Sequence, residues 1–171
     1  MSSRISTIKI VALAVASAGI AAGGLAAESK KHADTTSDLK LLERGHYLVS
    51  IGGCNDCHTP GYAPTGGKVP EKDWLVGDRL GWRGPWGTTY PTNLRLYMDN
   101  LTEQQWLTKA KQLETRPPMP WFTLRTMTDA DLRAIYRYVK HLGPAGKEAP
   151  AYVPPDKEPQ QPYVLFPAPP K

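Results

Sequence analysis

Five consecutive residues constrain this chain more than any other feature: Cys54, Asn55, Asp56, Cys57 and His58. The two thiols stand three positions apart, so each can add to one vinyl group of a porphyrin, and the adjacent histidine can then ligate the iron. The C-x-x-C-H spacing is the attachment motif of c-type haem. We therefore predict one covalently attached haem c, with Cys54 and Cys57 as thioether cysteines and His58 as an iron ligand.

The same C-x-x-C spacing also occurs in redox disulfides and in zinc sites. A zinc site is short of ligands here, because the chain has no third cysteine and its other histidines, His32, His46 and His141, are scattered. A thioredoxin-type motif follows a buried strand in a βαβ unit. The residues before Cys54 do not have the pattern of a strand, so both alternatives have less support than haem attachment.

The first 27 residues have the pattern of an export signal. Arg4 and Lys9 form a basic start, and an uncharged run rich in Ala, Val, Ile and Gly extends from Ile10 to Ala27. We expect cleavage near Ala26 or Ala27 and a periplasmic mature protein. The alternative is an uncleaved anchor, because eighteen uncharged residues approach the length that spans a bilayer. Membrane contact is expected only in that case.

Charge and composition limit the remaining classes of function. Removing residues 1–27 deletes two basic and no acidic side chains, so the formal net charge falls from +5 to +3. No basic tract with interleaved aromatic residues is present, and we expect no nucleic-acid binding. The 171 residues suit one domain, and the 17 prolines and 15 glycines predict much irregular backbone.

Three segments have helical periodicity: residues 38–53, 103–113 and 129–142. The polar residues 28–37 before the first segment are expected to be a flexible lead-in. Gly45 interrupts the first segment, and a glycine inside a helix costs roughly 1 kcal/mol relative to alanine. A close crossing with another helix would explain it. The third segment is the expected partner, since it has one apolar stripe (Leu132, Ile135, Tyr136, Val139 and Leu142).

The stretch from His58 to Thr102 has many turn signals and little periodicity. So long a loop is unusual in a small domain unless a cofactor replaces the missing core. We expect its three tryptophans, Trp74, Trp82 and Trp86, to pack against the core or the haem. We also expect one of its three arginines, Arg79, Arg83 and Arg95, to pair with a haem propionate.

The C-terminal segment, residues 144–171, contains nine of the seventeen prolines and is expected to be extended. A plain linker lacks large apolar residues, whereas this segment carries Tyr152, Val153, Tyr163, Val164, Leu165 and Phe166. We therefore expect it to lie along its own domain or along a partner protein. A disordered tail is the alternative.

Four stretches together resemble the bacterial class I cytochromes c, and are most similar to the cytochrome subunits or domains of periplasmic dehydrogenases. The stretches are residues 44–48 (RGHYL), 54–60 (CNDCHTP), 118–121 (PMPW) and 131–138 (DLRAIYRY). The resemblance covers about residues 38–143. It implies a small all-α domain whose N- and C-terminal helices cross beside the haem, with long irregular loops, followed by the Pro-rich tail. It also implies a methionine ligand shortly before the last helix.

Three methionines follow the export signal, and Met119 is the expected sixth iron ligand. It lies among Pro117, Pro118 and Pro120, which restrict the backbone and can hold a thioether towards the iron. Met127 is the second choice, because it directly precedes the expected helix cap and can serve as a hydrophobic staple. Met98 lies further from the last helix.

These features predict an electron-transfer protein rather than an enzyme. With His58 and Met119 filling both axial positions, the iron can change oxidation state without binding substrate. The expected partners are a periplasmic dehydrogenase and a downstream acceptor. The alternative is a haem enzyme or sensor of peroxide or a small gas with a labile sixth ligand, for which His46 and His141 are the distal candidates by residue type. We further expect Nδ1 of His58 to donate to a backbone carbonyl.

Overall fold

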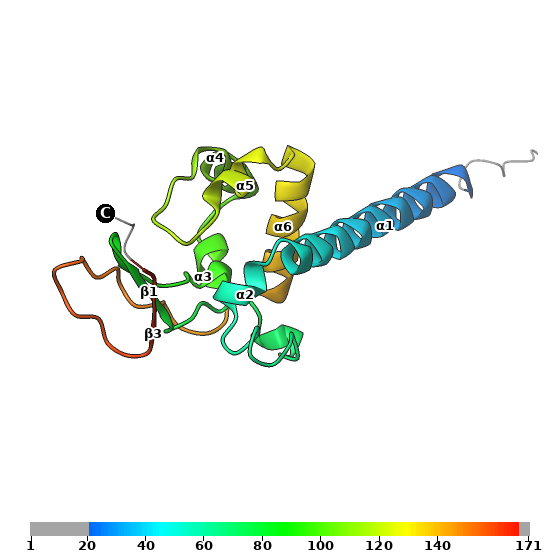
Figure 1. Cartoon of the computed structure of the whole chain (residues 1–171). Coiled ribbons are helices and arrows are strands. Elements are labelled where there is room, and N and C mark those ends of the chain that lie inside the picture. The colour runs from blue at the N-terminus through cyan, green and yellow to red at the C-terminus, as the bar shows by residue number, and fades with distance from the viewer. Residues whose placement is uncertain (1–20, 168–171) are drawn as a thin grey trace, which may run out of the picture. The chain divides into compact units, whose positions relative to one another are not determined.

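The computed structural model describes residues 21–167, with side chains from Thr35 onward. The helices and strands, labelled in Figure 1, are α1 (Ala21–Ile51), α2 (Cys54–His58), a 3-10 turn (Glu71–Asp73), β1 (Gly81–Gly84), β2 (Gly87–Thr89), α3 (Leu94–Asp99), α4 (Glu103–Gln112), α5 (Trp121–Thr126), α6 (Asp129–Leu142) and β3 (Tyr163–Leu165). The chain divides into two units after Thr36, and the unit from Ser37 onward contains the packed core.

Helix α1 begins well before Asp38, the start that its apolar periodicity predicts. Residues 28–37, expected to be a flexible lead-in, are helical, and the chain from 25 to 42 has no glycine or proline to interrupt a helix. Of the predicted export signal, residues 1–20 lie outside the described residues. Among the described residues, no helix is long and apolar enough to cross a membrane.

Helices α1 and α6 cross at Gly45, as predicted from its place in the sequence. A Cβ atom at this position would overlap the carbonyl oxygen of Ala134 and lie 2.5 Å from Cβ of Tyr138. Next to the crossing, the Arg44 guanidinium donates to the Asp131 carboxylate at 2.9 Å. The missing side chain therefore brings the two helices into direct backbone contact, which offsets the low helix propensity of glycine.

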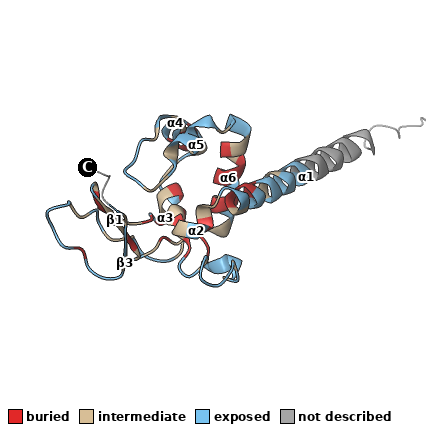
Figure 2. Ribbon diagram, viewed as in Figure 1, coloured by how far each residue is buried: buried red, intermediate tan, exposed pale blue. Residues whose placement is uncertain are grey.

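The core lies between α6, the C-terminal turns of α1, and helices α3 and α4 (Figure 2). The predicted helices at 103–113 and 129–142 are confirmed as α4 and α6, although α4 ends one residue earlier than predicted. Thr102 and Gln105 form a complete capping box, and Thr128 accepts a hydrogen bond from the Asp131 amide. The buried apolar residues of these two helices include Trp106, Leu107, Ala110, Leu132, Ile135, Tyr136 and Val139. The four from α6 belong to the apolar stripe expected from the sequence, and Ala134 and Tyr138 of the same helix are buried beside them.

The prediction of an all-α class I cytochrome fold is wrong, because the domain also contains a small mixed sheet. Its strand order is β2-β1-β3, with β1 antiparallel to β2 and parallel to β3. Two further short helices, α3 and α5, lie outside the three segments whose periodicity predicted helices. The domain is thus helical with a three-stranded sheet formed by the long loop and the tail.

Close approaches at glycines, rather than alternating apolar residues, allow the sheet to form. Gly84 and Gly87 flank the hairpin turn; Gly87 has φ of +95°, and a Cβ on Gly84 would lie 2.5 Å from the Trp86 ring. A strand of four residues paired with strands of three carries no usable period-two signal. The sheet therefore could not be recognised in the sequence.

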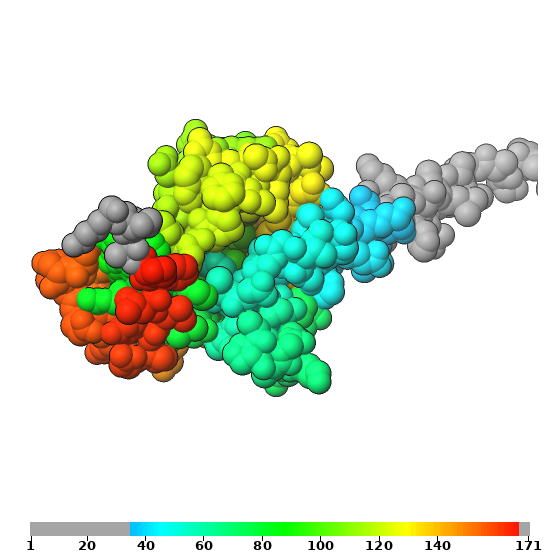
Figure 3. Space-filling view, viewed as in Figure 1, coloured from blue at the N-terminus to red at the C-terminus, as the bar shows by residue number. Residues whose placement is uncertain are grey.

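The Pro-rich tail docks on its own domain, one of the two expected arrangements. Figure 3 shows the tail, in orange to red, lying against the green segment that contains β1. The Phe166 amide donates to the Arg83 carbonyl at 2.7 Å, and Thr88 and Val153 exchange two backbone hydrogen bonds of 2.7 and 3.0 Å. Backbone pairing, supplemented by the apolar side chains, thus holds the tail in place.

Candidate functional site

The C-x-x-C-H residues form a single helical turn, α2, directly after α1. Gly53 separates the two helices and has φ of +67°, a conformation that glycine adopts without steric cost and that redirects the chain. Residues three apart on a helix lie on the same side. The thiols of Cys54 and Cys57, which are both free and half-buried, therefore share one side of the turn.

Both cysteine thiols lose their proton less readily than a free cysteine does. Burial raises the pKa of Cys54 to about 11, and burial followed by the charges of Asp56 and Asp78 raises the pKa of Cys57. A thioredoxin-type motif instead needs an attacking thiol whose pKa is lowered. The direction of both shifts thus argues against the redox-disulfide alternative, and no disulfide joins the two cysteines in this structure.

The His58 ring is oriented by the backbone. Its Nδ1 donates to the carbonyl oxygen of Thr92 at 2.7 Å, which confirms the predicted hydrogen bond. Burial lowers the pKa of His58, although the Thr92 carbonyl partly opposes this. The imidazole is therefore neutral at pH 7, with its proton on Nδ1 and the lone pair of Nε2 free to bind a metal.

Asn55, a motif residue to which the sequence assigned no role, belongs to a buried hydrogen-bond network. Its side chain is 1% exposed, and its Oδ1 accepts from the Thr59 hydroxyl at 2.7 Å. The same hydroxyl oxygen accepts from the Leu75 amide at 2.8 Å. The spacing of four residues between Asn55 and Thr59 was the available signal, because such residues adjoin along a helix.

The structure separates the three methionines by environment. Met98 is 1% exposed in α3 and belongs to the core, while Met127 packs against the core at the end of α5. Met119 lies between α4 and α5, is half-buried, and is not part of the core cluster. It comes from a different segment from the α2 cysteines, and among the three it has the thioether least involved in core packing.

Two of the three candidate arginines have other partners. Arg95 is 6% exposed and its guanidinium donates to the carbonyls of Lys72, Leu142 and Gly143, which caps the C-terminal end of α6. Arg83 pairs with Glu158 at 3.1 Å. Arg79 is exposed, and its side chain makes no ion pair with the described residues. Arg79 therefore remains the candidate to pair with a haem propionate, whereas the guanidinium groups of Arg83 and Arg95 already bind other groups of the chain.

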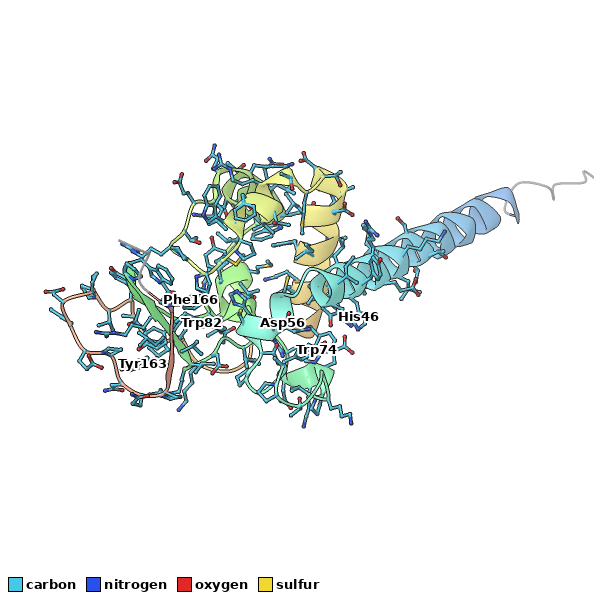
Figure 4. The ribbon with its side chains drawn as sticks, in the orientation of Figure 1. His46, Asp56, Trp74, Trp82, Tyr163 and Phe166 are labelled. Atoms are coloured by element: carbon cyan, nitrogen blue, oxygen red, sulfur yellow. The ribbon has the colours of Figure 1, made fainter. Side chains whose placement is uncertain are left out.

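The tryptophans divide into two aromatic groups (Figure 4). Trp74 is 8% exposed and stacks on His46 with 5.4 Å between ring centroids. Trp82 and Trp86 contact Phe166 of the tail, with centroid distances of 5.9 and 5.3 Å. Trp74 is thus a core residue, whereas Trp82 and Trp86 anchor the tail.

The donor set matches what haem c requires: two reduced thiols on one side of a helical turn, and an adjacent neutral imidazole with an available Nε2. The buried Nδ2 of Asn55, within the same turn, has no hydrogen-bond partner among the described residues. A buried side-chain amide such as this one usually has a hydrogen-bond partner. No cluster of three or more His, Cys, Asp or Glu residues suited to a metal occurs in the described part of the chain.

A comparison with characterised proteins finds sequence similarity between this chain and a dehydrogenase subunit. The chain is 30% identical over 122 residues to a nicotinate dehydrogenase subunit from Pseudomonas putida. The match covers 65% of this chain and 9% of the relative, so the chain is similar to a small part of a much longer dehydrogenase polypeptide. No protein-family model matches the chain, and no solved structure matches it significantly.

Proposed function

We propose that this protein is an exported monohaem c-type cytochrome that carries single electrons between a dehydrogenase and a downstream acceptor. The observation that carries the proposal is the α2 turn, where two free thiols with raised pKa values adjoin a neutral histidine held by the Thr92 carbonyl. The resemblance of four sequence stretches to class I bacterial cytochromes c supports the same chemistry.

Each residue then has a defined task. Cys54 and Cys57 would form the thioether links to the haem, and Nε2 of His58 would ligate its iron. Met119 supplies the second ligand through its sulfur. A haem held in this way would supply one-electron iron chemistry, and methionine ligation raises its reduction potential. The protein's own contribution is to fix the histidine ring through the Thr92 carbonyl and to provide the Met119 sulfur as a second iron ligand.

The alternative, a haem enzyme or sensor, needs an acid–base group beside an open sixth position. The two histidines considered for it are placed otherwise. His46 is exposed on α1 and stacks on Trp74, while His141 is exposed in the last turn of α6. The electron-carrier proposal therefore has more support.

A dehydrogenase is the partner we propose, because the relative is a dehydrogenase subunit. In that relative, the region similar to this chain is a small part of a polypeptide named as a dehydrogenase subunit. For the present chain we propose the periplasm as the compartment, on the basis of the signal pattern in residues 1–27.

Spectroscopy of the purified protein tests this function. We expect the oxidised protein to show the near-infrared charge-transfer band of methionine-ligated haem, and the reduced protein not to bind carbon monoxide rapidly. Met119→Ala should lose the band and bind carbon monoxide, whereas Met127→Leu, the matched control, should behave as the wild type. Rapid carbon monoxide binding by the wild type would support the enzyme or sensor alternative. A band that survives in Met119→Ala would reject Met119 as ligand.

A further inference from the structure

The segment before Met119 has little structure of its own. From 114 to 116 no backbone amide donates to another backbone group in the described chain, and the next two residues are prolines that form a turn directly before Met119. Regular structure resumes only at Trp121, whose amide donates to the Met119 carbonyl at 2.9 Å. The position of the Met119 sulfur therefore depends on side-chain contacts made by the preceding residues.

Two such contacts join this segment to the sheet and the tail. The Thr89 hydroxyl, at the end of β2, donates to the Pro117 carbonyl at 2.9 Å. The Arg116 guanidinium lies over the Tyr152 ring, with 3.9 Å between its Cζ and the ring centroid. This is the shortest of the four arginine–aromatic contacts found in the described residues, and cation–π attraction increases as the distance falls.

Tyr152 is itself fixed on both sides. Its hydroxyl donates to the Trp86 carbonyl at 2.8 Å, and its ring covers Gly87, where an added Cβ would lie 2.8 Å from the tyrosine. The next residue, Val153, pairs with Thr88 through two backbone hydrogen bonds. A ring immobilised in this way gives Arg116 a rigid surface to stack on.

We propose that Tyr152 is a positioning residue for Met119, and that the tail from 150 to 167 acts as a strap on the ligand-bearing loop. The strap acts through Arg116: by holding this residue over the Tyr152 ring it restrains the loop that carries Met119, and so would limit how easily the Met119 sulfur leaves a bound haem iron. This inference rests on the proposed function, because it assumes Met119 ligation. The sequence predicted only that the tail packs against its own domain or a partner. Through the Arg116–Tyr152 contact, the tail would also influence how firmly Met119 stays bound to the iron.

The rate of carbon monoxide binding to the reduced protein measures the strap, because the gas binds only when Met119 leaves. Loss of the aromatic ring in Tyr152→Ala should raise this rate roughly two- to tenfold, as expected for the loss of one cation–π contact. Tyr47→Ala is the matched control: Tyr47 also lies under an arginine, Arg44, at 5.5 Å, but on α1. Its rate should equal that of the wild type.

Two milder variants test the same contact without removing the tyrosine ring. Arg116→Gln should raise the rate as Tyr152→Ala does, and Tyr152→Phe, which keeps the ring, should raise it less. Combining Arg116→Gln with Tyr152→Ala should add little, since both remove one interaction. These variants remain informative even where Tyr152→Ala folds poorly.

The results separate the strap from the proposed function. A wild type without methionine-ligated haem would reject the function, whatever the variants do. A wild type with methionine-ligated haem, together with Arg116→Gln and Tyr152→Phe rates equal to that of Tyr47→Ala, would overturn the strap alone. Raised rates in the Arg116 and Tyr152 variants, with urea unfolding midpoints close to the wild-type value, would support it.

Discussion

Nδ1 of His58 and the carbonyl oxygen of Thr92 lie 2.7 Å apart, which ties the α2 turn to the segment that leads into α3. The neighbouring Asn93 is fully buried and fixes this segment. Its Oδ1 accepts from the amides of Arg95 and Leu96, and its Nδ2 donates to the carbonyls of Ala145 and Lys147. The orientation of the histidine thus depends on a buried asparagine in another segment.

Asn93→Ala should therefore destabilise the protein by roughly 1–3 kcal/mol, through loss of a helix cap and of buried hydrogen bonds. Urea unfolding of the variant measures the loss. Asn100→Ala is the control, because the Asn100 amide bonds only the Leu96 carbonyl and is exposed; it should cost less than about 0.5 kcal/mol. Equal costs for the two variants would contradict this role for Asn93.

Gly45→Ala should separate α1 from α6, because the new methyl group would overlap the Ala134 carbonyl. Overpacking of this kind costs roughly 1–3 kcal/mol, despite the better helix propensity of alanine. Glu43→Ala, at an exposed position of the same helix, should leave the unfolding free energy nearly unchanged. Thermal unfolding compares the two, and a Gly45→Ala protein as stable as the wild type would refute the tight crossing.

Thr59→Val should leave the buried Leu75 amide and Asn55 Oδ1 without partners, since the Thr59 hydroxyl bonds both. We expect a loss of roughly 1–3 kcal/mol in unfolding free energy. Thr65→Val removes an exposed hydroxyl that bonds the Gly61 carbonyl and should cost much less. A small loss in Thr59→Val, similar to that in Thr65→Val, would show that this network contributes little.

The raised pKa of the Tyr138 hydroxyl should make the protein less stable at alkaline pH. Burial, with a 2.6 Å hydrogen bond from its hydroxyl to Glu71, raises the Tyr138 pKa above its ordinary value of 10.0. Below pH 10 the phenol is protonated in both states and the stabilisation is complete. Above pH 10 the unfolded phenol ionises first, so stability should fall by about 1 kcal/mol per pH unit. Melting temperatures from pH 8 to 11 should fall less steeply in Tyr138→Phe, and identical slopes would contradict the prediction.

Periodic and capped segments were predictable from the sequence. The helical periodicity of α4 and α6 depends on neighbouring residues alone, so both helices were found in the sequence, and the caps at Thr102 and Thr128 fix where they begin. Gly45 also indicated a close helix crossing, because glycine is unfavourable inside a helix unless a neighbouring helix needs the space. The hydrogen bond of the His58 ring followed from the requirement that a metal-binding imidazole be oriented.

The sheet and the role of Asn55 were not predictable in the same way. Strand β3 pairs with β1 across a long sequence separation, and glycine contacts rather than a repeating pattern permit it. Arg95 resembled a propionate ligand by its position, yet it caps α6 through the Leu142 and Gly143 carbonyls, which only the folded chain brings near it. Long-range contacts of this kind leave no local signal.

The intact mass of the mature protein, purified from a periplasm that attaches haem to other cytochromes, tests the central claim most directly. We predict the polypeptide mass plus one haem that survives denaturation, and its loss when Cys54 and Cys57 are both replaced by serine. A wild-type mass that equals the polypeptide alone, while other c-type cytochromes in the same cells carry haem, would contradict the account.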